Sequence, residues 1–125
     1  MKTKTYEQGY SDGYTAGRQS VGIHIQNYPV VTLCGSTKFK DDFIETQKRL
    51  TLQGYIVISV GLFGHSGDDL NNSKEMLDDM HKRKIDLADE IYVINKNGYI
   101  GSSTKSEIEY AKAHGKKITY LENQE

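Results

Sequence analysis

The sequence predicts an α/β fold: a minimal Rossmann-like (flavodoxin-like) three-layer fold with a four-stranded parallel sheet of order 2-1-3-4 and an N-terminal helical extension. Three observations carry this prediction. The chain has 125 residues, which suits one domain. After Pro29, four short apolar runs alternate with three helix-like segments. Such alternation is typical of right-handed βαβ units, and two of the loops that follow strands are rich in glycine and hydroxyl residues.

The first half of this region contains two predicted strands. Residues 30–34 (VVTLC) form a short β-branched run that ends at a glycine, which indicates a buried strand. Apolar residues then recur at helical spacing over about 39–53, and residues 55–60 (YIVISV) predict the second strand. Residues 61–72 form a loop that contains three glycines.

The second half repeats the alternation. A helix is predicted over about 73–88, with the third strand at 91–94 (IYVI). A loop of Gly, Ser and Asn residues covers 95–103, a last helix spans about 105–114, and the fourth strand covers 117–121. In the order 2-1-3-4 the chain leaves the first and third strands in opposite directions, and α/β sheets bind ligands at such a switch point.

Two loops meet at this predicted switch point, and both run into helix N-termini, which favour phosphate or carboxylate groups. Neither loop has the spacing of a P-loop or of a dinucleotide-binding GxGxxG, so ATP hydrolysis and NAD chemistry are not supported. The alternative is that Ser36 or Thr37 merely caps a helix. The candidate substrate-binding residues are Cys34, Gly35, Ser36, Thr37, Lys38, Gly98, Tyr99, Gly101, Ser102, Ser103 and Thr104.

Glu107 is the first candidate for chemistry. It lies at the edge of the helical stripe that packs on the sheet, whereas Glu109 is about 200° away and should face solvent. In a first helical turn, the helix dipole would keep the Glu107 carboxylate ionised. The alternative is structural, because Thr104-Lys105-Ser106-Glu107 also fits a capping box, S/T-x-x-E.

His81 falls on the apolar stripe of the preceding helix. A lone inward histidine is more often a hydrogen-bonded core residue than a catalyst, and Asp78, three residues earlier, could bond its imidazole. The basic run 81–84 is interpreted as a solvated helix face. The four histidines show no metal-ligand spacing and Cys34 is the only cysteine, so we expect no metal and no cofactor.

Composition narrows the class of partner and the compartment. The net charge is −1, from 16 basic and 17 acidic residues, which argues against binding to a nucleic-acid polymer. No apolar run approaches the roughly 20 residues of a membrane span, and the first residues lack the apolar stretch of a secretion signal. A single cysteine excludes an internal disulfide and predicts a cytoplasmic protein.

Residues 1–28 differ from the predicted α/β domain at 29–125. Tyr6, Tyr10 and Tyr14 recur every four residues, and glycines recur at the same period. The tyrosines would share one face of a helix, which each interior glycine weakens by roughly 1 kcal/mol. The segment is therefore either a frayed extension or a tyrosine-faced helix that docks on the domain or on a second subunit.

The chain resembles the nucleoside 2-deoxyribosyltransferase superfamily, which includes the 2′-deoxynucleoside 5′-monophosphate N-hydrolases. The resemblance covers about residues 30–121 and depends on the order and spacing of four segments. These segments are Leu33-Cys34-Gly35-Ser36, Asp86-Leu87-Ala88-Asp89, Gly98-Tyr99-Ile100-Gly101, and Glu107 followed by Tyr110-Ala111-Lys112-Ala113-His114-Gly115-Lys116-Lys117.

This resemblance implies that Glu107 attacks the sugar anomeric carbon and that Ser36 contacts the sugar or phosphate. It also implies a homodimer or larger homo-oligomer whose subunits complete each other's sites. The position of a catalytic aspartate in the family aligns with His81, and Asp78 and Asp79 lie within one turn of it. Thr32 stands where the family often has tyrosine.

The expected function is therefore cleavage of an N-glycosidic bond, or deoxyribosyl transfer, on nucleosides or nucleoside 5′-monophosphates. As in retaining glycosidases, a second group must protonate the departing base, and Asp78, Asp79 or His81 could supply that proton. The main alternative is a non-catalytic protein that senses or sequesters a nucleotide in the same crevice. A cytokinin-type phosphoribohydrolase is a weaker alternative, because no PGGxGTxxE run is present.

Overall fold

Four parallel strands form the sheet at the centre of the domain. The computed structural model of the chain describes residues 27–123. The strands are β1 (Val30–Gly35), β2 (Ile56–Ile58), β3 (Glu90–Ile94) and β4 (Lys117–Tyr120), and their order is β2-β1-β3-β4. The predicted α/β fold and its strand order are therefore confirmed.

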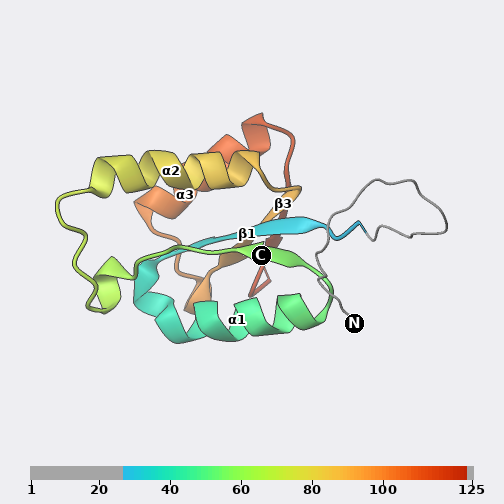
Figure 1. Ribbon diagram of the computed structural model, residues 1–125, viewed down its shortest axis with the longest axis horizontal. Coiled ribbons are helices and arrows are strands. Elements are labelled where there is room, and N and C mark those ends of the chain that lie inside the picture. The colour runs from blue at the N-terminus through green and yellow to red at the C-terminus, as the bar shows by residue number, and fades with distance from the viewer. Residues whose placement is uncertain (1–26, 124–125) are drawn as a thin grey trace, which may run out of the picture.

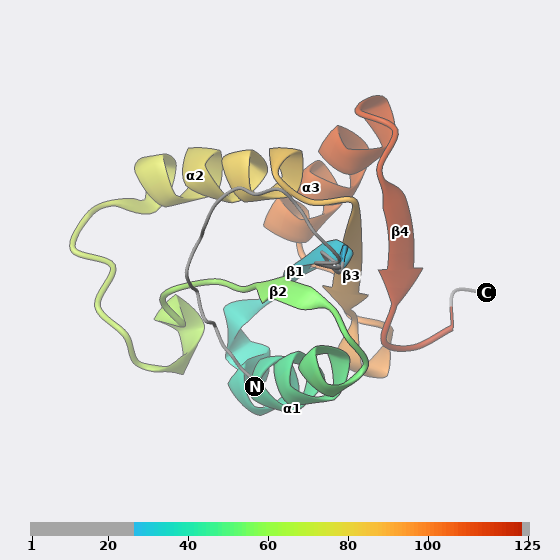
Figure 2. The same ribbon diagram turned by 45° about the vertical axis from the view of Figure 1, so that its right-hand side comes forward.

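Three helices cover the two faces of this sheet. α1 (Lys40–Leu52) lies on one face, and α2 (Lys74–Asp86) and α3 (Ser102–Ala113) lie side by side on the other (Figures 1 and 2). The connection from β1 through α1 leads to β2 at one edge of the sheet, and the connection from β2 through α2 runs in the opposite direction, past β1, to β3. The helices of these two connections therefore lie on opposite faces of the sheet. The two crossover directions create the switch point between β1 and β3.

Each face of the sheet has its own hydrophobic core. On the α1 side, Phe43 and Leu50 pack against the strand residues Val31, Leu33 and Ile94. The α2–α3 side buries a second cluster in which both helices contact β1 and β3. Its members are Cys34, Ile85, Ile91, Val93, Ile108 and Ala111. Since alternate residues of β1 serve opposite faces, Cys34 points toward α2 and α3 while Leu33 points toward α1.

β2 is shorter than the sequence predicts. The expected strand covered residues 55–60, but pairing with β1 ends at Thr32 opposite Ile58. Beyond that point the backbone carbonyl of Ser59 accepts a hydrogen bond from the Lys84 side chain, at 2.8 Å. β-branched composition predicted strand up to Val60, but the backbone there leaves the sheet and opens space beside the end of β1.

α3 begins earlier than the sequence predicts, at Ser102 instead of about residue 105. Gly101 occupies the N-cap position with extended backbone and no side-chain cap, and its carbonyl accepts from the Lys105 N–H at 2.9 Å. Thr104 is only 3% exposed and lies inside the helix. The capping-box alternative for Thr104 and Glu107 is therefore wrong.

Gly35 closes β1 in a conformation that side chains rarely adopt, with φ of 153°. A Cβ added there would lie 2.8 Å from the backbone oxygen of Ile94. We expect Gly35→Ala to lower the free energy of unfolding by about 2 kcal/mol or more, because the clash involves backbone that cannot rotate away. Urea denaturation measures this. Gly61→Ala is the control, since a Cβ there meets nothing within 4 Å and should change stability little. Equal effects of the two substitutions would contradict the close approach of β1 and β3.

The tyrosine repeat of Tyr6, Tyr10 and Tyr14 lies outside the described residues, so the docking expectation stays a prediction. Within residues 27–123, no helix has the length and apolar character needed to cross a membrane.

Candidate functional site

A cavity of about 500 Å³ lies at the carboxyl ends of the strands, at the predicted switch point. The loops that follow β1 and β3 form two of its walls, and one side of α2, from Lys74 to Lys84, forms a third. The loop after β2 closes the side where β2 ends early. Most of the predicted site residues line the cavity. These are Gly35, Ser36, Thr37, Asp78, His81, Tyr99, Gly101, Ser102, Ser103, Thr104 and Glu107.

Four predicted site residues do not line the cavity. Cys34 is fully buried at the end of β1, next to His81. The Lys38 ammonium lies over the ring of Tyr99, 3.6 Å from its centroid, and Gly98 forms a turn with positive φ. Asp79 is exposed on α2. The second carboxylate available to a ligand in this cavity is therefore Asp78, and not Asp79.

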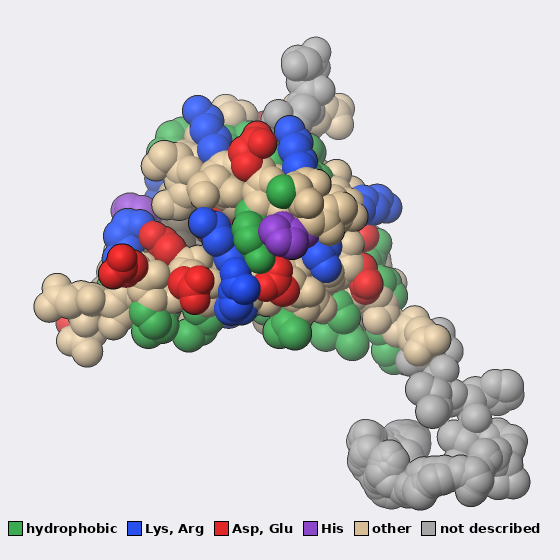
Figure 3. Space-filling model, turned by 90° about the horizontal axis from the view of Figure 1, so that it is seen from above, with side chains coloured by type: hydrophobic (Ala, Val, Ile, Leu, Met, Phe, Trp, Pro, Cys, Tyr) green, Lys and Arg blue, Asp and Glu red, His purple; other side chains and the backbone are tan. Residues whose placement is uncertain are grey.

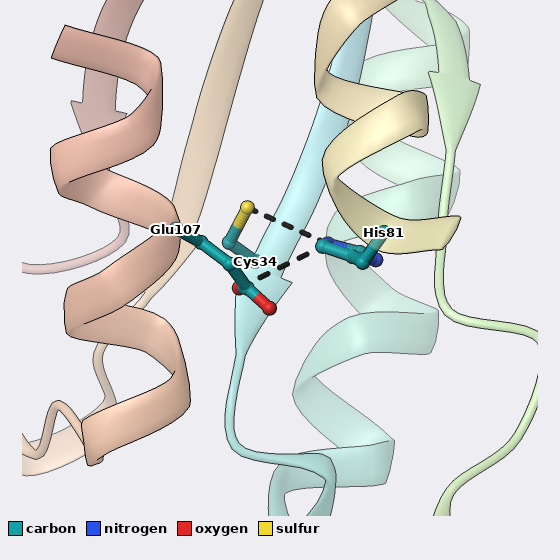
Figure 4. A group of neighbouring side chains, drawn as sticks. All are labelled: Cys34, His81 and Glu107. Carbon is teal, nitrogen blue, oxygen red and sulfur yellow. Dashed lines mark hydrogen bonds and ion pairs between the residues drawn. The ribbon is translucent and has the colours of Figure 1, made fainter. Parts of the chain in front are cut away.

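Cys34, His81 and Glu107 form a buried cluster, with one residue each from β1, α2 and α3 (Figure 4). The Cys34 Sγ and His81 Nε2 atoms are 3.6 Å apart, and His81 Nε2 lies 3.9 Å from Glu107 Oε1. The His81 and Glu107 side chains are 9% and 13% exposed. Glu107 therefore presents a nearly dehydrated carboxyl group to the cavity, in the second turn of α3.

The orientation of His81 follows from the early end of β2. Its Nε2 lies 3.0 Å from the carbonyl oxygen of Leu33. Since a carbonyl can only accept, Nε2 carries the proton in this arrangement. Strand carbonyls point alternately to the two neighbours; the Pro29 carbonyl accepts from Ile56 of β2 and that of Val30 from Asp89. The Leu33 carbonyl therefore points to the β2 side, where β2 has already ended. His81 supplies the hydrogen-bond donor that a longer β2 would have provided.

The predicted hydrogen bond between His81 and Asp78 is not present. The Asp78 carboxylate instead pairs with Lys74, four residues earlier on α2, at 2.7 Å. The helical spacing of Asp78 and His81 permits contact, but the bond to Leu33 turns the imidazole toward the sheet. This leaves Asp78 at the cavity wall with a side chain 51% exposed.

Burial sets the protonation of the cluster. It raises the pKa of Glu107 to about 7, with the nearby Asp78 charge acting in the same direction and a hydrogen bond with Cys34 opposing it. Burial lowers the pKa of His81 to about 4, and Lys84 adds to that effect. The pKa of the Cys34 thiol is raised by burial and by Glu107. At neutral pH, His81 and Cys34 are therefore uncharged, and Glu107 is close to half ionised.

The expectation that the helix dipole keeps Glu107 ionised is therefore wrong. The residue lies in the second turn of α3 and not in its first, so the N-terminal field is weaker there, and dehydration of the carboxylate outweighs it.

The cluster contains residue types that bind zinc, and its three ligand atoms all lie within 4.8 Å of one another. A metal ligand, however, needs the lone pair of the imidazole nitrogen. His81 Nε2 uses that position for the proton that it donates to Leu33. The geometry thus describes a hydrogen-bonded cluster of protein groups, and its chemical resource is the Glu107 carboxyl.

Ser36 and Thr37 have different roles after β1. The Ser36 hydroxyl accepts from the Lys38 N–H at 3.3 Å and caps a single 3-10 turn, Thr37–Phe39. The Thr37 hydroxyl lies 2.8 Å from His65 Nδ1. The backbone carbonyl of Thr37 accepts a hydrogen bond from the Ser66 hydroxyl, also at 2.8 Å. The capping alternative thus describes one contact of Ser36, while Thr37 fastens the loop that follows β2.

Most of the cavity residues that the sequence does not predict come from that loop. It contributes Val60, Gly61, Leu62, Gly64, His65 and Leu70 to the cavity. A signal was present, because a loop with three glycines directly after a parallel strand must lie at the carboxyl edge of the sheet. α2 adds Lys74, Leu77, Met80 and Lys84. Lys84 contradicts the interpretation of residues 81–84 as a solvated face.

Comparisons of the chain with family models, with curated proteins and with solved structures found no match.

Proposed function

We propose that this protein cleaves the N-glycosidic bond of a nucleoside or nucleoside 5′-monophosphate, with Glu107 as the nucleophile, and passes the sugar to water or to another base. One observation carries the proposal. The Glu107 carboxyl faces a ligand-sized cavity at the switch point of the sheet, is 13% exposed, and does not cap its own helix. A carboxyl kept from water without a structural role is a candidate for chemistry.

The reaction assigned to Glu107 is a double displacement. Its carboxylate attacks the anomeric carbon as the bond to the base breaks, through a transition state that resembles an oxocarbenium ion. The bonding electrons leave with the base, which takes up a proton, and the sugar is held as an ester of Glu107. Water or a second base then attacks the same carbon and releases the carboxylate. A negative charge close to the anomeric carbon also stabilises the positive charge that develops there.

Of the three predicted proton donors, Asp78 is the one that lines the cavity and makes no bond to the sheet; to protonate the departing base it must first exchange its pairing with Lys74 for a proton. Asp78 lines the cavity from α2, the helix that lies beside α3 with its Glu107. His81 Nε2 already donates to Leu33, and Asp79 does not line the cavity. Apolar side chains also line the cavity and suit a flat base; these are Leu77 and Met80 of α2, with Leu62 and Leu70 of the loop after β2.

The second candidate function is a nucleotide-binding protein without catalysis. The cluster favours it in one respect: His81 occupies the position that aligns with a catalytic aspartate of the family, and it forms a structural hydrogen bond there. A binder would use the same hydroxyl-rich loops and apolar wall but would release its ligand unchanged.

We also infer a homo-oligomer and a cytoplasmic location, as the resemblance and the single thiol imply. Met76 and Met80 are 51% and 42% exposed on α2, and Met80 also lines the cavity. A second copy that covered these methionines would lie at the edge of the site. Cys34 is a buried free thiol, which suits a reducing compartment.

Incubation with ribo- and deoxyribonucleosides and their 5′-monophosphates tests the proposal. Chromatography of the products should show free base from at least one member, and a second added base should reveal transfer. Recovery of every nucleotide intact, together with measurable binding, would establish the non-catalytic alternative.

A further inference from the structure

Lys84 places a positive charge in the wall of the cavity, where the sequence predicted a solvated residue. The side chain is half-buried, and its ammonium donates to the carbonyl of Ser59 at 2.8 Å. Its backbone is held as well, because the Thr32 hydroxyl donates to the Lys84 carbonyl at 2.9 Å. These two bonds tie Lys84 to β1 and to the end of β2, so the ammonium is positioned next to the space that β2 vacates.

The other charged side chains of this helix have different surroundings. Lys74 pairs with Asp78 at 2.7 Å and Arg83 pairs with Asp86 at 2.9 Å. Across the face formed by α2 and α3, basic and acidic side chains are mixed (Figure 3). Within residues 27–123, by contrast, no carboxylate lies within 4.0 Å of the Lys84 ammonium. Its pKa is lowered by burial.

The Lys84 ammonium is half-buried, bonds one neutral acceptor and has no carboxylate partner among residues 27–123. Charges taken from water are normally paired or fully hydrogen-bonded. An ammonium has three N–H donors, and Ser59 occupies one of those of Lys84. Two residues after Ser59, Gly61 lines the same cavity without a side chain, and a Cβ there would meet no atom within 4 Å. The cavity wall thus holds an ammonium that is free to bind an anionic group, and there is room for that group.

We propose that Lys84 binds the phosphate of the ligand, which makes the natural ligand a nucleoside 5′-monophosphate and not a nucleoside. Only the nucleoside part of this ligand rests on the proposed function; the phosphate part is inferred from Lys84. On the first turns of α2, Lys74 already pairs with Asp78. The Glu107 carboxyl, when ionised, repels an anionic group from the α3 wall, whereas the Lys84 ammonium attracts it toward the end of β2. The ligand's phosphate and its anomeric carbon would therefore lie at opposite sides of the cavity.

Binding of inorganic phosphate and of monophosphates tests the role of Lys84. In the parent, phosphate should raise the melting temperature relative to chloride at equal ionic strength. Measured by calorimetry, Lys84→Met should lower the affinity for the best-bound monophosphate by about 10-fold or more, as expected for loss of a hydrogen bond to a charged group. The affinity for the corresponding nucleoside should change by less than about threefold. Lys84→Arg should retain part of the preference. Lys48 is an exposed residue of α1 that does not line the cavity. Lys48→Met removes the same charge, and its affinities for both ligands should match those of the parent.

Two results would overturn the proposal. One is a parent protein that phosphate does not stabilise and that binds monophosphates no better than nucleosides. The other is a folded Lys84→Met protein, judged by circular dichroism, that keeps the parent's preference. Ser36→Ala, measured alongside, shows whether the loop after β1 carries the preference instead. Because all of these readouts are binding, absence of base release would count against the proposed reaction and leave the Lys84 result unaffected.

Discussion

Replacing Glu107 by glutamine is expected to abolish base release while the protein still folds and binds its nucleotide. Gln has nearly the same size and shape, so the wall of the cavity is preserved. It lacks the negative charge that attacks the anomeric carbon, and an amide is a poor nucleophile. We expect the rate to fall by about a thousandfold or more, on the order of 4 kcal/mol in the barrier. Single-turnover release of free base, measured with the substrate that the panel identifies, gives this rate.

Glu109→Gln is the matched control for this substitution. Glu109 lies on the same helix with its side chain 76% exposed, and it faces Lys112 at 3.9 Å. Removal of that charge should leave the rate within about twofold of the parent, since exposed pairs contribute little. A Glu107→Gln protein that releases base at the parent's rate would exclude the covalent mechanism. The substitution is informative because Gly101, and not a capping box, begins α3.

The pattern of apolar residues predicted the layer architecture and the strand order, because each strand or helix shows a single spacing of apolar residues along its length. β1 is a continuous apolar run, and the helices show their buried faces at helical spacing. Once the order 2-1-3-4 is fixed, the loops at Gly35 and Gly101 must converge, so the place of the site follows from topology. Glu107 and Ser36 can be identified from the sequence for that reason, and both line the cavity.

The sequence could not predict how the cavity side chains are oriented, because that depends on where elements end. The capping-box pattern at Thr104 is valid locally, but α3 starts at Ser102, three residues earlier than that pattern predicts, and Thr104 is buried inside it. The imidazole of His81 turns to Leu33 only because β2 stops at Ile58. Lys84 turns inward for the same reason, since the free carbonyl of Ser59 accepts its ammonium.

The buried cluster should also determine how stability depends on pH, through two opposite contributions. Burial raises the pKa of Glu107 from 4.5 to about 7, so the folded state holds the extra proton in this range. Stability from Glu107 is therefore present below pH 4.5 and is lost as the pH rises to about 7. Burial lowers the pKa of His81 from 6.5 to about 4, so the unfolded state binds the extra proton, and stability is gained as the pH rises from 4 to 6.5. Each contribution is about 3 kcal/mol.

These contributions should cancel in the parent between about pH 4.5 and 6.5, and single substitutions should reveal each one. In Glu107→Gln only His81 titrates, so the free energy of unfolding should rise by about 3 kcal/mol, relative to the parent's profile, as the pH increases from 4.5 to 6.5. In His81→Gln only Glu107 titrates, and stability should fall by a similar amount over the same range. The double substitution should restore the parent's slope. Urea denaturation at half-unit pH steps measures all four profiles, and surface carboxylates contribute equally to each. Single variants whose profiles run parallel to that of the parent would mean that neither group is dehydrated in the folded protein, which would also remove the physical basis for Glu107 as a buried nucleophile.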